Sequence, residues 1–179
     1  MGLAFFFLFI TQAKAYFEND FFVRHELVRQ GILSTPAVFK AGEQYIFSDC
    51  CVSPKTVLIK ILNVDQKEVH YLETHTDKVG SVEKIEGWIN SESGQLNKYI
   101  VNGKALPIDP QEAIDVKIDK QISIATPVGT VRAVKVYSNR DILFSEWTVS
   151  EQVPGNGIVY LYQQVITSSS STKWIDYSP

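Results

Sequence analysis

The segment that runs from residue 124 to residue 162 constrains the fold most strongly, because it alternates short strand-like runs with turn sequences. The runs are rich in β-branched and aromatic residues, and they are separated by Thr-Pro-Val-Gly at 126–129 and Val-Pro-Gly-Asn-Gly at 153–157. This alternation of strand-like runs and turn sequences is typical of antiparallel strands joined by turns. The segment holds no grouping of nucleophile, base and orienting residue. It therefore predicts a β-rich binding or structural domain, and we expect no enzymatic activity.

The same pattern continues through most of the chain. Asn102-Gly103 is the strongest short hairpin signal, since both residues tolerate the positive φ angles that a two-residue turn needs. Residues 109–114 are expected to begin a short helix, and the serine run at 168–171 is expected to be a polar loop. The remaining runs predict roughly nine or ten strands at the spacing of an all-β sheet or barrel: 44–47, 55–64, 67–76, 83–89, 95–101, 121–125, 130–137, 142–149, 158–166 and 173–177.

The first fifteen residues have the features of a secretory signal peptide. Residues 3–10 are an unbroken apolar run, and Ala13 and Ala15 match the small-x-small pattern of a cleavage site. The run is too short for a transmembrane helix, which needs about 20 apolar residues. The alternative is a buried N-terminal strand or helix. A signal peptide at 1–15 predicts an exported, periplasmic protein, which could associate with the outer membrane.

Residues 16–32 predict the main helix of the chain. Apolar residues recur there at roughly helical spacing, with Arg24, Glu26 and Arg29 between them. Asn19 or Asp20 is expected to cap the first turn, and Gly31 is expected to end the helix. Pro36 then predicts an extended linker. The expected domain organisation is a helix and linker at 16–38 followed by a β-rich domain at 39–179.

Cysteine and histidine give little support to a reactive centre. Cys50 and Cys51 are the only cysteines, and a vicinal disulfide, two free thiols or a link to another chain all remain open. His70 and His75 lie on one predicted strand at a spacing that directs them to opposite faces. We therefore expect solvent-facing histidines and no metal site. A thiol-dependent enzyme that uses Cys50 or Cys51 with His70 is the least favoured hypothesis.

Charge and aromatic content narrow the range of partners. The formal net charge is −3 and the lysines are scattered, so nucleic acid is not an expected partner. No cofactor is expected either. The strands carry aromatic residues that are candidates for the lining of an apolar cavity, although ordinary core positions are the alternative: Trp88, Phe144, Trp147, Tyr160 and Tyr162.

Four stretches resemble bacterial envelope domains of the lipoprotein-carrier (LolA/LolB-like) fold. They are residues 39–45, 126–136, 146–150 and 153–159, with a Gly after the Thr-Pro turn, a Trp-containing strand and a Val-Pro-Gly-Asn-Gly turn. The resemblance spans most of residues 39–166. It implies a curved antiparallel half-barrel that wraps a helix and covers an apolar cavity, hence a mainly β (α+β) fold. No ligand residue of the carriers maps onto this chain.

Two non-catalytic hypotheses follow from these features. The first is a periplasmic domain that binds a lipid or a lipoprotein acyl chain on its concave sheet. The second is a structural subunit of a multiprotein envelope or secretion assembly, in which the sheet offers its edges and faces to other envelope proteins. The absence of a cysteine directly after the apolar run argues against a lipoprotein-type anchor.

Overall fold

In a computed structural model of the chain, the structure describes residues 16–50, 55–108, 115–140, 143–165 and 168–179. The expected signal peptide and the expected helix at 109–114 lie outside these ranges. Within them the chain forms one helix and eleven strands: α1 (Tyr16–Arg29), β1 (Gln44–Cys50), β2 (Lys55–Val64), β3 (Glu68–Asp77), β4 (Val82–Asn90), β5 (Leu96–Val101), β6 (Lys104–Ala105), β7 (Lys117–Thr126), β8 (Gly129–Arg140), β9 (Leu143–Val149), β10 (Ile158–Val165) and β11 (Ser168–Ser178).

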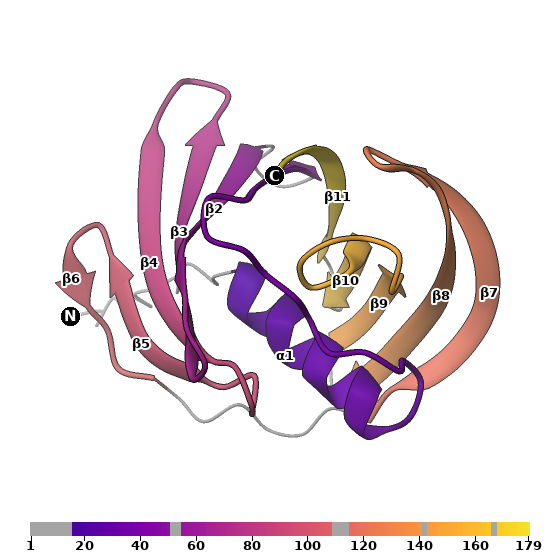
Figure 1. The fold of residues 1–179 in the computed structure, drawn as a ribbon. Coiled ribbons are helices and arrows are strands. Elements are labelled where there is room, and N and C mark those ends of the chain that lie inside the picture. The colour runs from indigo at the N-terminus through magenta and orange to yellow at the C-terminus, as the bar shows by residue number, and fades with distance from the viewer. Residues whose placement is uncertain (1–15, 51–54, 109–114, 141–142, 166–167) are drawn as a thin grey trace, which may run out of the picture.

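The eleven strands make one antiparallel sheet in the order β6-β5-β4-β3-β2-β1-β11-β10-β9-β8-β7. The sheet curves around α1 but does not close, because β6 and β7 lie at its two edges (Figure 1). The predicted fold class, a mainly β protein with a curved open antiparallel sheet and an N-terminal helix, is confirmed. Its assignment to the lipoprotein-carrier fold stays a prediction.

The centre of the sheet joins two meanders. Strands β1 to β6 form one and β7 to β11 the other, and β1 pairs with β11 between them, with Gln44 opposite Ser178. The expected polar loop at 168–171 is wrong, because these serines begin β11. They pair with the end of β10, where Ser169 lies opposite Gln164. Ladder bonds from a neighbouring strand override the weak strand propensity of serine.

The predicted turn at Asn102-Gly103 and the predicted helix end at Gly31 both have the positive φ angles that these positions need. Asn102 and Gly103 both have positive φ angles, 49° and 82°, in the turn between β5 and β6. Gly31, at φ 71°, follows the end of α1. There the amide of Ile32 donates to the carbonyl of Leu27 at 2.9 Å and that of Gly31 donates to Val28 at 3.0 Å. This pair of bonds is the Schellman arrangement that ends many helices, and it fixes the direction of the linker.

Helix α1 occupies the concave side of the sheet and takes part in both halves of the core (Figure 1). Phe21 packs in a cluster that includes Phe47 and Ile59 of the first meander and also residues of β8, β10 and β11. Val23 and Leu27 pack in a second cluster with residues of β8, β9 and β10, including Trp147. The helix therefore fills the space between the two meanders, and burial of each large apolar side chain contributes about 1.5–3 kcal/mol.

Replacing Leu27 with alanine should test how much the fold depends on this helix. Leu27 is fully buried, so Leu27→Ala removes apolar contacts and leaves a cavity, with an expected cost of about 2–5 kcal/mol in the free energy of unfolding. Urea denaturation measures the cost. The matched control is Leu62→Ala. Leu62 is 37% exposed on β2, so this variant should lose much less free energy of unfolding. Equal losses would show that α1 does not support the core.

Candidate functional site

A cleft lies beside the end of α1. It has a volume of about 670 Å³ and opens between the helix end, the hairpin of β7 and β8, and the loop after β9. We call it the β8 cleft. Its wall is made by Ile32, Leu33, Gln121, Ile122, Ser123, Arg132, Ala133, Val134, Val149, Ser150, Glu151 and Gln152.

The β8 cleft has an apolar floor and a polar rim. Leu33, Ala133 and Val149 are buried, whereas Arg132 and Gln152 are exposed. The rim is held by two bonds: the amide of Arg132 donates to Gln152 Oε1 at 2.6 Å, and Ser150 Oγ donates to the carbonyl of Arg132 at 2.5 Å. This arrangement suits a ligand with an apolar body and a polar or anionic end.

A buried arginine joins α1 to two other segments near the cleft, the linker after the helix and the loop after β9. Arg24 is only 2% exposed, and its guanidinium donates to the carbonyl of Thr35 at 2.7 and 3.0 Å and to the carbonyl of Ser150 at 3.3 Å. Burial lowers the pKa of Arg24, and the nearby charge of Glu151 opposes that change. Gly157 leaves room for the guanidinium, since a Cβ there would lie 2.4 Å from Nη1.

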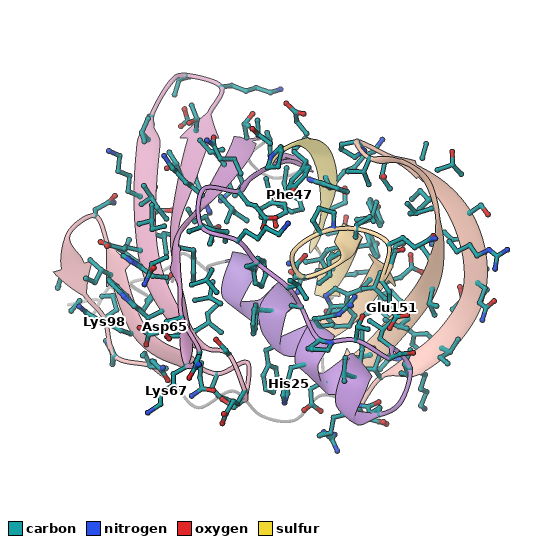
Figure 2. The ribbon with its side chains drawn as sticks, viewed as in Figure 1. His25, Phe47, Asp65, Lys67, Lys98 and Glu151 are labelled. Atoms are coloured by element: carbon teal, nitrogen blue, oxygen red, sulfur yellow. The ribbon has the colours of Figure 1, made fainter. Side chains whose placement is uncertain are left out.

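Glu151, an exposed residue of the loop after β9, also connects this loop to the linker after α1. Its Oε1 accepts hydrogen bonds from the amides of Ser34 and Thr35, the latter at 2.8 Å. The bond from the Thr35 amide is the main reason that the pKa of Glu151 lies below its ordinary value, with the Ser34 amide and the charge of Arg24 acting in the same direction. Figure 2 shows Glu151 on the side of α1 that faces β8.

A second buried polar group lies where β1 meets β11. Glu43 is 3% exposed and accepts hydrogen bonds from Tyr45 Oη at 2.7 Å, Tyr177 Oη at 2.9 Å and the amide of Lys40 at 2.9 Å. Burial, the bond to Glu43 and the charge of Glu43 together raise the pKa of Tyr177 to about 12. The same causes, with burial again the largest, raise the pKa of Tyr45. This cluster joins the linker to the centre of the sheet.

The third polar cluster is on β3 and corrects one prediction. His75 is 3% exposed, so the expectation of a solvent-facing histidine is wrong at this position. Its Nε2 contacts Glu73 Oε1, and its Nδ1 lies 2.7 Å from Lys55 Nζ. Because an ammonium only donates, Nδ1 accepts and Nε2 carries the proton toward Glu73. A polar side chain can be buried when it has hydrogen-bond partners, and Glu73 and Lys55 are those partners for His75.

His70 lies on the opposite face of β3, as its spacing from His75 predicts. Its ring stacks on Trp88 at 4.2 Å, and its Nε2 lies 2.8 Å from Glu86 Oε1. No group of three or more potential metal ligands occurs among the described residues. The side chain of Cys50 and the whole of Cys51 lie outside them, so the disulfide and thiol hypotheses stay predictions.

The five aromatic candidates do not gather around one cavity. Trp147 packs in the core cluster that includes Leu27 and Val149, on the concave side. Strand alternation directs the other four to the opposite face, where they are partly exposed: Trp88, Phe144, Tyr160 and Tyr162. Phe144 contacts Tyr162 there, and Lys98 Nζ lies 4.2 Å from the Trp88 ring centre. Ligand binding by these five residues stays a prediction.

Sequence reasoning missed the residues that form the β8 cleft. They come from the helix end, from strands β7, β8 and β9 and from the loop after β9, so only tertiary structure brings them together. The signals that could have pointed to them are Arg24 among the apolar residues of the helix and the close pair of glycines at 155 and 157. No described helix is long and apolar enough to cross a membrane.

Comparisons with known proteins identify a similar structure but no family. No protein-family model matches the chain, and no curated protein matches its sequence. The structure is similar to one described as "a putative lipoprotein from Parabacteroides distasonis ATCC 8503", with a TM-score of 0.47 and 14% identity over 80% of this chain and 100% of that one. A likeness of this degree does not establish a shared function.

The carboxylate of Glu151 should make stability depend on pH. Its lowered pKa means that its contribution is fully present above about pH 4.5, the ordinary value, and is lost as pH falls through the lower folded-state value. Glu151→Gln should therefore be less stable than the wild type at neutral pH, by less than about 1 kcal/mol because the group is exposed, and should match it at low pH. Urea midpoints across the acid range measure this difference. Glu92→Gln, in the exposed turn after β4, is the control and should show no such convergence.

Removing the charge of Glu43 should lower the pKa of Tyr177. We expect Glu43→Gln to shift this pKa from about 12 part of the way toward its ordinary value of 10.0, since the burial that is its largest cause remains. In the wild type the raised value stabilises the fold below pH 10, and this contribution is lost as pH rises toward 12. Titration of tyrosine absorbance measures the shift, and Tyr177→Phe identifies the signal. An unchanged value would contradict the role of Glu43.

Proposed function

We propose that this chain is a non-catalytic, exported envelope domain that binds the apolar part of a ligand, such as the acyl chain of a lipid or lipoprotein, in the β8 cleft. The observation that carries the proposal is the buried apolar floor of this cleft, formed by Leu33, Ala133 and Val149. Its volume of about 670 Å³ lies within the range of roughly 300–1,000 Å³ that is common for small-molecule sites.

The position of α1 supports a ligand site at the side of the concave face rather than at its centre. Phe21, Val23 and Leu27 fill the centre with buried contacts, so a ligand there would have to displace the helix. The β8 cleft is hollow without any displacement. A bound chain would lie against Ile32 and Val134, next to the helix end.

The composition of the rim supports a ligand with a polar end and a non-catalytic role. Arg132 is exposed there, and among the described residues it makes no ion pair, so its guanidinium is available to an anionic head group. The residues that form the cleft wall include no histidine and no cysteine. The signal-like pattern at 1–15 supports export to the periplasm, where such ligands are carried between membranes.

A structural role in an envelope assembly is the second candidate. It is favoured by the open sheet, in which the long edge strand β7 has no neighbour from the described part of the chain on its outer side. Stable co-purification of the chain with a large envelope complex would support this role. A chain that is always recovered as a monomer from mild detergent extracts of its host would count against it.

A variant that fills the β8 cleft should test acyl-chain binding. Val134 is half-buried in the cleft wall, so Val134→Trp should occupy the space and weaken the uptake of a fluorescent fatty acid by about tenfold or more. The matched control, Val82→Trp on β4, adds the same ring at a site that is 54% exposed and should bind like the wild type. Circular dichroism checks that both variants are folded.

Two outcomes would contradict the proposal. In the first, the wild-type protein binds neither the fluorescent fatty acid nor any lipid that native mass spectrometry detects after purification from the host. In the second, Val134→Trp binds the probe as well as the wild type does, which would place any lipid site outside the cleft.

A further inference from the structure

The edge strand β7 is long and exposed. It spans ten residues, Lys117–Thr126, and among the residues that the structure describes it pairs with β8 alone. Ile118 is 56% exposed, and the other residues of the strand are exposed or half-buried. In an antiparallel ladder every second residue of an edge strand directs its N–H and C=O groups away from the sheet, so β7 offers a row of backbone donors and acceptors. The opposite edge strand, β6, has only two residues.

The two halves of β7 differ in their protection against pairing with another strand. Residues 117–120 contain Lys117, Asp119 and Lys120, and charges of this kind discourage unwanted edge pairing. Residues 121–126, Gln-Ile-Ser-Ile-Ala-Thr, contain no charge and no proline. This uncharged half has the composition of a strand that readily accepts a neighbour.

Charge indicates which kind of neighbour would fit. Residues 117–140, which form β7, β8 and their turn, hold five Lys or Arg and one Asp. Their net charge is therefore +4, and since the whole chain carries −3, the remaining residues carry −7. Lys117, Lys120 and Arg132 are exposed, and none of the three forms an ion pair with another described residue. An acidic partner would be attracted to this edge.

The β8 cleft adjoins the uncharged half of β7. Gln121, Ile122 and Ser123 belong to both the strand and the cleft wall. A strand added to β7 would direct alternate side chains to the face that carries this wall, where an apolar side chain could reach Ile32 or Val134. Backbone bonds would then give affinity and the cleft would give selectivity, as in known cases of strand addition.

We propose that β7 is a docking site for an extended acidic peptide segment of a partner protein, which adds as a further antiparallel or parallel strand along residues 121–126. Acidic side chains of the segment lie near Lys117, Lys120 and Arg132, and an apolar side chain enters the β8 cleft. The proposal goes beyond acyl-chain binding and does not depend on it, because β7 and its charges carry it.

The test uses the full chain and a fluorescein-labelled peptide, as long as β7, in which Glu and Val alternate. At low salt we expect saturable binding by fluorescence anisotropy, and weaker binding as salt screens the charges. The exchange of every second amide of β7 should slow when the peptide is bound. A peptide in which Lys replaces Glu should bind at least about tenfold more weakly.

Two sets of variants separate strand addition from simple charge attraction. Methylation of one alternate set of peptide amides should abolish binding, while methylation of the other set should leave it unchanged, because only one set faces the edge. The double variant Lys117→Glu, Lys120→Glu should weaken binding by roughly fivefold or more. Its control, Lys67→Glu, Lys78→Glu, makes the same charge change at exposed turns and should bind like the wild type.

Several results would overturn the proposal: no binding, equal binding of both methylated peptides, equal effects of the two double variants, or unchanged exchange of the β7 amides. A concentration-dependent dimer that pairs through β7 and excludes the peptide would also overturn it. Failure of peptide binding with intact fatty-acid uptake removes only this inference. Failure of uptake with intact peptide binding removes only the proposed acyl-chain function.

Discussion

The contact between α1 and the concave face is the interaction on which the rest of the structure depends. The open sheet of eleven strands has an apolar inner face, the described residues form no second sheet that covers it, and the helix supplies that cover. Phe21 belongs to a cluster that includes residues of both meanders, and Leu27 belongs to a cluster with residues of β8, β9 and β10, so the helix connects the two halves of the core. The same contact moves the available hollow from the centre of the sheet to the β8 cleft.

Burial of the helix between the two meanders also buries a charged residue, Arg24. Because a buried guanidinium needs partners, the linker and the loop after β9 approach it with the carbonyls of Thr35 and Ser150. Glu151 then holds the linker from outside. The segments that satisfy the arginine are also those that border the cleft, so its shape and the burial of this charge are coupled.

Local signals predicted much of the fold, and long-range contacts account for what they missed. Gly31 and the Asn102-Gly103 pair act through their own backbone angles, so sequence is enough to place them. The serines at 168–171 become a strand only because β10 lies beside them. His75 is buried only because Glu73 and Lys55 meet it. The β8 cleft could not be predicted for the same reason, since its wall combines four distant segments.

The pairing of β1 with β11 has a consequence for how the protein is made. Neighbours at the centre of the sheet are the first and last of the described strands, so the sheet cannot be completed until all eleven strands are available. Before that point β1 has a free edge, and the cover that α1 gives to the sheet is incomplete. Such long-range closure slows folding, so the native sheet can form only after the C-terminal strand has been synthesised.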